Sequence, residues 1–255
     1  MFPAVFLSHG APTLPLVDSP ARDFLRGLGK ELGRPRAILV ASAHWETPAP
    51  VVSTSPRNTT MHDFYGFPRE LYELRYEPPG APDIAVTAAK LLNQAGLPTG
   101  WDATRGLDHG AWVPLLLMYP AADVPVLQIS IQPPLGPRHH LAVGRALAEL
   151  RQIDVLIIGS GSFTHNLSRF RGAAVNAPAP PDVIAFADWF DQAITQHRTA
   201  DTLHYRALAP HAVEQHPTDE HLLPLFVAMG AGGNGERLHS SAMYSVLRMD
   251  AYAFR

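Results

Sequence analysis

Three short apolar runs, each followed by a small-residue turn and a histidine, constrain the fold of this chain most strongly. They occupy residues 4–7, 37–40 and 155–158. Apolar runs of this length without alternating polar residues are typical of strands that are buried on both faces of a parallel sheet. We therefore expect three central strands whose carboxyl ends lead into turns.

Helical patterns separate the three runs. Ser19 and Pro20 have the residue types of a helix N-cap and a first helical position, and apolar residues at helical spacing follow as far as Gly33. Further helices are predicted at 83–95, 137–150, 181–195 and 218–229, and further strands at 126–131 and 243–249. This alternation predicts an α/β fold in which helices cover both faces of a largely parallel or mixed sheet.

The composition favours one compact domain over residues 1–255, with 46% hydrophobic and 17% charged residues. A net charge of −3 provides no polybasic surface, so we expect neither nucleic acid nor a membrane as a partner. No apolar run approaches the ~18 residues of a membrane span, and no signal peptide is recognisable, so we expect a cytoplasmic protein. The oligomeric state stays open.

The absence of cysteine limits the chemistry that the chain can perform. A disulfide, a thiolate zinc site and a cysteine nucleophile are all excluded. Any metal ion must therefore be held by nitrogen and oxygen ligands.

Three histidines, His9, His44 and His165, follow the three apolar runs. In open α/β sheets, ligands bind beyond the carboxyl ends of the strands. Neutral imidazole is a common ligand of zinc, iron and copper. A single histidine at a strand end more often bonds to nearby backbone, but the shared position of these three favours a divalent metal site.

A fourth histidine, His221, follows Glu220 in the segment predicted to begin the helix at 218–229, with Thr218 as its N-cap. Either Glu220 or His221 could be a metal ligand. In the alternative, Glu220 complements the helix dipole and His221 caps the turn. The residues alone leave both alternatives open.

Other histidines have candidate roles beside such a metal. His109 precedes an apolar helix and could supply a proton-transfer group. His62, Asp63 and Phe64 belong to an aromatic loop that could line a pocket for a flat substrate, or could simply pack over the core. The remaining histidines are expected at the surface: His139, His140, His197, His204, His211, His216 and His239.

Six short motifs occur in series from His9 to Leu225. They are Ser8-His9-Gly10, Ser42-Ala43-His44-Trp45, His62-Asp63-Phe64 with Gly66-Phe67-Pro68, Asp108-His109-Gly110, Thr164-His165-Asn166-Leu167 and Glu220-His221-Leu222-Leu223-Pro224-Leu225. Together they closely resemble the DOPA 4,5-dioxygenase-like group of class III extradiol ring-cleavage dioxygenases, which is related to the catalytic subunit of protocatechuate 4,5-dioxygenase.

This resemblance implies one divalent metal ion, Fe(II) for activity, with Zn(II) also possible as the bound ion. By the same resemblance, His9 and His44 match the two metal histidines. The third ligand is a glutamate in the protocatechuate branch and a histidine in the DOPA-like branch, so we favour His221 over Glu220.

The resemblance also implies roles for two further histidines. His165 matches a histidine that acts as acid and base in one branch and contacts the metal in zinc-loaded members of the other, which makes it a possible fourth ligand. His109 matches a second active-site histidine that binds substrate or assists proton transfer.

The expected activity is therefore insertion of O2 into the ring of a catechol, DOPA or a related compound, with cleavage next to the vicinal hydroxyls. A small aromatic diol and O2 are the expected partners. One alternative is a zinc-dependent hydrolase in which metal-bound water is the nucleophile. Another is a non-catalytic metal-binding module on the same fold.

Overall fold

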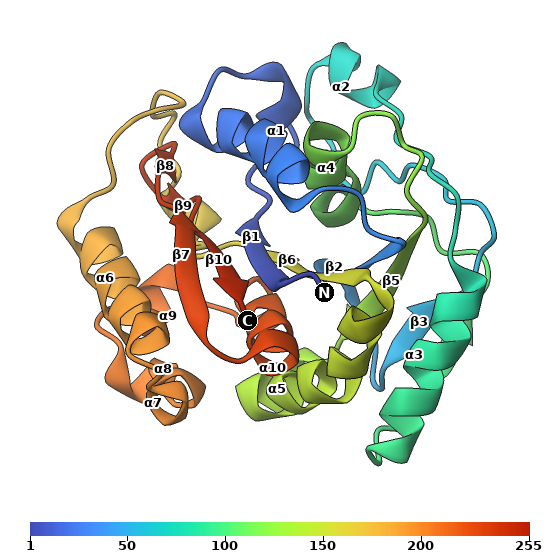
Figure 1. The fold of residues 1–255 in the computed structure, drawn as a ribbon. Helices are drawn as coiled ribbons and strands as arrows, with labels where there is room; N and C mark the ends of the chain where they lie inside the picture. Colours follow the sequence, from blue (N-terminus) through green and yellow to red (C-terminus); the bar gives the residue numbers. More distant parts are fainter.

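The computed structural model describes residues 1–255, and a mixed sheet of eight strands crosses its centre in the order β4-β3-β5-β2-β6-β1-β10-β7 (Figure 1). The strands are β1 (Ala4–Ser8), β2 (Ala37–Glu46), β3 (Val51–Ser53), β4 (Gly100–Asp102), β5 (Val126–Ile131), β6 (Val155–Gly161), β7 (Gly235–His239) and β10 (Ala251–Phe254). The four central strands β5, β2, β6 and β1 are parallel, whereas β3 is antiparallel to β5 and β10 is antiparallel to β1 and β7. The predicted α/β fold with a largely parallel or mixed sheet is confirmed.

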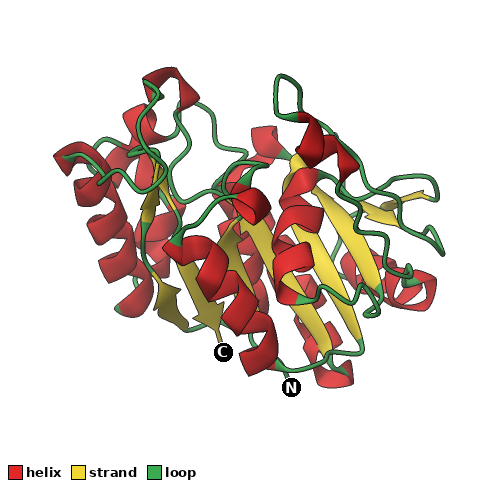
Figure 2. Ribbon diagram, turned by 90° about the horizontal axis from the view of Figure 1, so that it is seen from above, coloured by secondary structure: helices red, strands yellow, loops and turns green.

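Helices cover both faces of this sheet (Figure 2). On one face lie α1 (Pro20–Leu32) and α4 (His109–Met118), and on the other α3 (Pro82–Gln94), α5 (Gly136–Leu147) and α10 (Leu223–Gly232). Beside β7 lies α6 (Pro181–Thr195), followed by the short helices α7 (Thr199–Leu203), α8 (Tyr205–Leu208) and α9 (Ala212–Gln215). The other short helices are α2 (Arg69–Glu73) and 3-10 turns at Leu14–Leu16, Pro133–Leu135, Ala148–Ile153 and Leu167–Arg169.

The apolar runs fold as central strands because both of their faces are buried. In β1, Ala4 and Phe6 pack toward α5 and α10, whereas Val5 and Leu7 pack toward α1 and α4. Side chains of a strand alternate between the two faces of a sheet, so a run that is apolar at every position suits a strand covered on both sides. None of the helices combines the length and apolar character that crossing a membrane requires.

The structure corrects two predicted elements. Residues 243–249 do not form the last strand, because Tyr244 and Ser245 adopt positive φ angles and turn the chain between β8 (Ala242–Met243) and β9 (Leu247–Arg248). The last strand is β10, which pairs with β1. The helix predicted from Thr218 begins at Leu223 as α10, with Pro224 in its first turn, a position that proline favours.

Two histidines expected at the surface are instead buried. His140 accepts a hydrogen bond from the Gln132 N–H and donates one to the Gly136 carbonyl. His216 donates to the Phe163 carbonyl and packs against Phe186. Their surface assignment was wrong because each ring bonds to a backbone group inside the protein, which is how buried polar groups are normally satisfied.

Candidate metal centre

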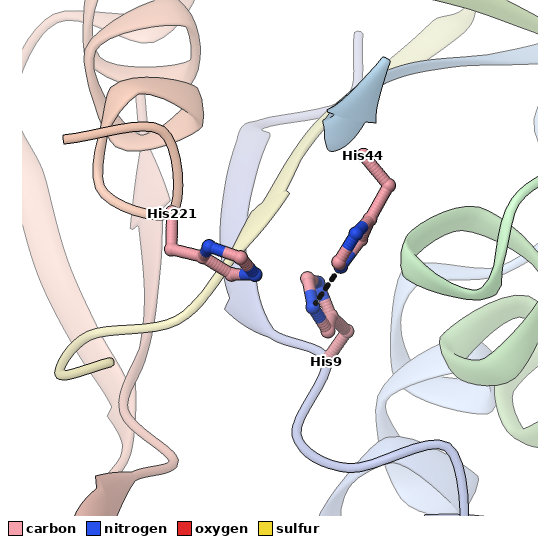
Figure 3. Close-up of side chains that lie close together, drawn as sticks. All are labelled: His9, His44 and His221. Carbon is pink, nitrogen blue, oxygen red and sulfur yellow. Dashed lines mark hydrogen bonds between the residues drawn. The ribbon is translucent and has the colours of Figure 1, made fainter. Parts of the chain in front are cut away.

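Three imidazoles converge at the carboxyl ends of the parallel strands (Figure 3). His9 directly follows β1, His44 lies near the end of β2, and His221 lies in the turn before α10. Figure 3 shows the three rings pointing toward one another. One nitrogen of each ring lies within 4.8 Å of the corresponding nitrogens of the other two.

Glycines allow two of these imidazoles to reach the sheet edge. Gly10, which follows His9, has a φ of +67°, a conformation that residues with a Cβ rarely adopt. At the end of β6, a Cβ on Gly161 would lie 2.0 Å from the His221 carbonyl oxygen. The missing side chain lets the His221 turn approach the strand, where the Ser162 N–H donates to that oxygen over 2.8 Å.

The hydrogen bonds of His9 leave its Nε2 atom without a proton. Nδ1 lies 3.0 Å from Ser160 Oγ, and the Ser160 hydroxyl hydrogen is donated to the Gly110 carbonyl. A hydroxyl has only one hydrogen, so Ser160 accepts its bond from His9 Nδ1–H. The lone pair of Nε2 therefore faces the site.

His44 meets His9 directly, with 3.1 Å between the two Nε2 atoms. Its Nδ1 lies 3.8 Å from Asp63 Oδ2, and the carboxylate favours a proton on that nitrogen. Without an ion, His44 Nε2–H can donate to the His9 Nε2 lone pair, whereas a His44 proton on Nδ1 leaves both lone pairs available to one cation. Two nitrogens that each lie about 2.1 Å from one ion are separated by about 3.0 to 3.4 Å at octahedral or tetrahedral angles, so the observed separation fits a shared metal.

His221 completes the group. Its Nδ1 lies 3.0 Å from Glu220 Oε1 and donates to that carboxylate, while its Nε2 is buried without any hydrogen-bond partner. A carboxylate behind an imidazole is the usual arrangement for a histidine ligand, because it holds the ring in place and increases its basicity. The unpaired Nε2 is the observation that fits a metal most directly, since buried polar atoms are otherwise bonded.

Burial keeps the three imidazoles neutral. It lowers the pKa of His9 and of His221 well below the ordinary value, and the neighbouring histidines lower both pKa values further. For His44, burial and the nearby His109 lower the pKa to about 4, against opposing effects of Asp108 and Asp63. Neutral imidazole is the form that binds metals.

Two other groups of side chains have the composition of a metal site. One consists of His44, Asp63 and His109, and the other of His165, Glu220 and His221. In each group the carboxylate already accepts a hydrogen bond from an imidazole. In the group of His9, His44 and His221, three imidazole nitrogens lie close together and no carboxylate belongs to the group.

Asp63 holds His109 in a fixed orientation. Asp63 Oδ1 accepts from the His109 backbone N–H over 2.9 Å and from His109 Nδ1 over 3.0 Å. Burial raises the pKa of Asp63, but the hydrogen bonds from the ring and the backbone N–H of His109 outweigh that effect and lower the pKa to about 2. Ionised Asp63 keeps the proton on Nδ1, so His109 Nε2 is free to accept a proton.

His165 stacks on His221, with 3.4 Å between the ring centroids and 11° between the ring planes. Burial lowers the pKa of His165 to about 4. Imidazole lone pairs lie in the plane of the ring, so an ion bonded in the plane of His221 lies out of the plane of the parallel His165 ring. This stacking disfavours coordination of the same ion by both histidines.

A buried polar network supports His44 and His109 from behind, and the sequence analysis missed it. Fully buried Asp108 caps α4 through the Ala111 N–H and accepts further bonds from Ser42, Gln128 and Arg105. Arg105 in turn donates to the His44 carbonyl over 3.1 Å. An aspartate before a helical pattern signals an N-cap, but no pattern in the sequence indicates its distant partners.

Ser160, the partner of His9, was also missed. It lies in residues 159–162, which were interpreted as a small-residue turn, but residues 159–161 are the end of β6. The pairing of β6 with β1 places Ser160 beside Leu7, which is two residues before His9. Pairing between strands that are distant along the chain cannot be inferred from the small residues themselves.

The five histidines of the site face a cavity of about 250 Å³. Its other walls are largely apolar and include Phe64, Phe67, Leu167 and Leu247. Of the three loop residues expected to contact substrate, Phe64 lines the cavity. Asp63 lies behind His109, and His62 lies outside the wall, with its Nε2 3.2 Å from the Leu74 carbonyl and its ring near Trp112.

An α/β sheet with imidazoles converging at its strand ends defines a candidate metal-dependent enzyme. The sequence matches the family described as the catalytic LigB subunit of aromatic ring-opening dioxygenase over residues 3–255. The chain belongs to this family and is therefore an enzyme of the dioxygenase class, so a hydrolase or a non-catalytic module is not favoured.

Individual relatives agree with this assignment. The chain is 42% identical to the 4,5-DOPA dioxygenase extradiol of Beta vulgaris, covering 98% of this chain and 95% of the relative. It is 36% identical to the protein of the same name from Escherichia coli K12, covering 90% and 84%. A crystal structure of an uncharacterized Escherichia coli K12 protein aligns over 100% of both chains with a TM-score of 0.83 and 29% identity.

Proposed function

We propose that this chain, as one catalytic domain over residues 1–255, cleaves the ring of a catechol at one Fe(II) ion held by His9, His44 and His221. The observation that carries the proposal is the convergence of three Nε2 atoms, one of which is buried with no other partner. Ser160 and Glu220 fix the protonation of His9 and His221 from behind. This support leaves the Nε2 atoms of His9 and His221 unprotonated, so each can bind the metal.

For the third ligand we propose His221, with Glu220 behind it. The Glu220 carboxylate is occupied by His221 Nδ1, whereas His221 Nε2 faces the other two imidazoles. A Glu220 ligand would require this hydrogen bond to break and would leave the buried Nε2 of His221 unpaired. Breaking a satisfied contact to leave a buried polar atom unpaired is unfavourable.

The metal accounts for the chemistry that no side chain here can supply. A bound Fe(II) would act as a Lewis acid that lowers the pKa of the catechol hydroxyls, and it would supply the redox-active centre that reaction with O2 requires. Zn(II) has no redox chemistry, so we propose Fe(II) for turnover and Zn(II) as an ion that binds without supporting it.

The protein's own residues then position the ring and move protons. Phe64 and Phe67 offer aromatic surfaces at the cavity wall against which a flat ring can lie. His109 Nε2, oriented by Asp63, accepts a proton from a substrate hydroxyl. His165 faces the same cavity from beside His221 and serves as the second acid and base, positioned to return a proton as the ring opens.

Largely apolar walls assist this reaction by limiting water around the catechol. Charges and hydrogen bonds act more strongly where water is excluded.

The cytoplasmic location expected from the sequence stays a prediction.

Anaerobic reconstitution tests the proposal. The protein is loaded with Fe(II) under argon, mixed with each of a panel of catechols, and then exposed to air while oxygen uptake and product mass are recorded. We expect one O2 consumed per catechol and a product that contains both oxygen atoms. Full iron occupancy with no oxygen uptake for any catechol would contradict the proposal.

A further inference from the structure

A second cavity, of about 260 Å³, adjoins the cavity that contains the histidines. The two share four lining residues, Ala11, Phe67, Leu167 and Leu247. The second cavity is completed by Thr13, Phe170, Tyr244 and Val246. A ring held beside the histidines therefore has a space next to it into which a substituent can extend.

The lining of the second cavity contains no charged side chain. Its two side-chain polar groups, the hydroxyls of Thr13 and Tyr244, lie 3.4 Å apart and bond to each other. The rest of the lining is apolar, including the ring of Phe170, which meets Tyr244 edge to face. An apolar group that enters this space would leave water without giving up any hydrogen bond of its own, which is favourable.

The charged residues that lie nearest along the chain are outside the lining, and Arg171, next to Phe170, donates to the backbone carbonyls of Ser168 and Phe170. Arg169 bonds to Asp182, and Arg248 bonds to Asp250. Inside the first cavity, the ionisable groups are the histidines that the proposed function assigns to the metal and to proton transfer. Neither lining therefore contains an Asp, Glu, Lys or Arg side chain that could pair with a carboxylate or an ammonium group on a substrate.

From these walls we infer that the substrate of the proposed ring cleavage carries an uncharged, apolar substituent that occupies the second cavity. This inference rests on the proposed function and specifies its substrate class. The substrate inferred in this way differs from the DOPA in the names of the relatives, whose amino-acid substituent bears two charges. Burying such charges without partners is strongly unfavourable, whereas burying each methylene group contributes roughly a fourfold gain in affinity.

The test compares three catechols that share a three-carbon substituent at the same ring position and differ in the number of charged groups that it carries. They are 4-propylcatechol, 3,4-dihydroxyphenylpropionate and 3,4-dihydroxyphenylalanine, with unsubstituted catechol as the reference. Binding to the Zn(II)-loaded protein is measured by calorimetry under argon, where no turnover occurs.

We expect 4-propylcatechol to bind about tenfold or more tightly than catechol, and the affinity to fall as charge is added. Tighter binding of 3,4-dihydroxyphenylalanine than of 4-propylcatechol would overturn the inference. If the Fe(II) enzyme cleaves catechol but prefers 3,4-dihydroxyphenylalanine, the inference fails and the proposed function stands. If no catechol binds or is cleaved, both fail.

Substitutions at Phe170 localise the effect, because this side chain is 46% exposed and lines only the second cavity. Phe170→Ala should remove most of the advantage of 4-propylcatechol and leave the binding of catechol unchanged. Phe170→Lys should reverse the order in favour of 3,4-dihydroxyphenylpropionate, because it supplies a cation. Leu208→Ala, at a 52% exposed residue outside both cavities, is the matched control. Unchanged selectivity in both Phe170 variants would overturn the inference.

Discussion

His9 and His44 are 35 positions apart in the sequence, yet their Nε2 atoms lie 3.1 Å apart near the carboxyl ends of β1 and β2. The strand β6 lies between β1 and β2 and pairs with both, so all three strands end at the same edge. The hydrogen bond from His9 Nδ1 to Ser160 of β6 turns the His9 lone pair toward His44. The geometry of a metal site is thus set by strand order together with one serine.

The first prediction separates the roles of His221 and Glu220. His221→Ala should abolish stoichiometric metal binding, because it removes a ligand. Glu220→Gln retains an acceptor for Nδ1–H, so it should keep the metal and lower the affinity about 10- to 100-fold. Metal content after dialysis and competition with a chelator measure both. A larger loss in Glu220→Gln than in His221→Ala would show that the carboxylate is the ligand.

The second prediction concerns Asp63, which orients His109 without lying against the substrate. Asp63→Asn removes the charge that keeps the proton on His109 Nδ1, so kcat should fall about tenfold or more while metal content stays at the wild-type level. Asp123→Asn, in an exposed ion pair with Arg34, is the control. Loss of metal from Asp63→Asn would place that carboxylate in the coordination sphere instead.

The third prediction concerns His165. His165→Gln should retain the metal and reduce kcat by roughly 100-fold or more, because a general acid and base is lost. If His165 were a fourth ligand, metal affinity would fall together with kcat. Parallel measurement of the dissociation constant for Zn(II) and of oxygen uptake distinguishes the two roles.

The fourth prediction concerns Asp108, whose carboxylate accepts hydrogen bonds from three other side chains in a fully buried position. Asp108→Asn leaves Arg105 without its charged partner, so the free energy of unfolding should fall by about 3 kcal/mol. The exposed Asp123→Asn should change it by less than about 0.5 kcal/mol. Urea unfolding of the metal-free proteins measures both, and equal effects would show that the buried network contributes nothing.

The fifth prediction concerns acid stability. Burial lowers the pKa of His140 and of His216 to about 4, whereas the same residues in an unfolded chain titrate near 6.5. Between these values the unfolded state binds more protons, so the free energy of unfolding falls as the pH falls from about 6.5 to about 4. Above this window the two histidines are neutral in both states and contribute no pH dependence.

Guanidinium midpoints of the metal-free protein, measured from pH 7 to pH 4.5, test this expectation. The lowered pKa values of His9, His44, His165 and His221 act in the same direction. His216→Gln can still donate a hydrogen bond to Phe163, and it should make the decline shallower. A midpoint that stays constant over this range would contradict the neutral, buried state of these histidines.

The sequence was informative about the sheet because its central strands are apolar on both faces. The same logic failed near the C-terminus, where nothing in the residue types marks Tyr244 and Ser245 for the left-handed conformation that turns the chain. For α10 the signal was present in Pro224, which favours a first helical turn, but Thr218 offered a competing N-cap.

For the site, the sequence indicated which histidines follow the strands, and family resemblance indicated which of them act together. The partners that fix their protonation, Ser160 for His9 and Asp63 for His109, depend on contacts between distant segments. A hydroxyl or carboxylate carries no local pattern that identifies such a partner. These contacts become visible only when the strand order and the loop positions are known.

The most direct test of the account is a crystal structure of the Fe(II)-loaded protein with anomalous diffraction at the iron edge. The account predicts one iron peak within about 2.2 Å of the Nε2 atoms of His9, His44 and His221, with Glu220 still bonded to His221 Nδ1. Iron coordinated by Glu220 or His165 in place of His221, or iron bound elsewhere in the molecule, would contradict it.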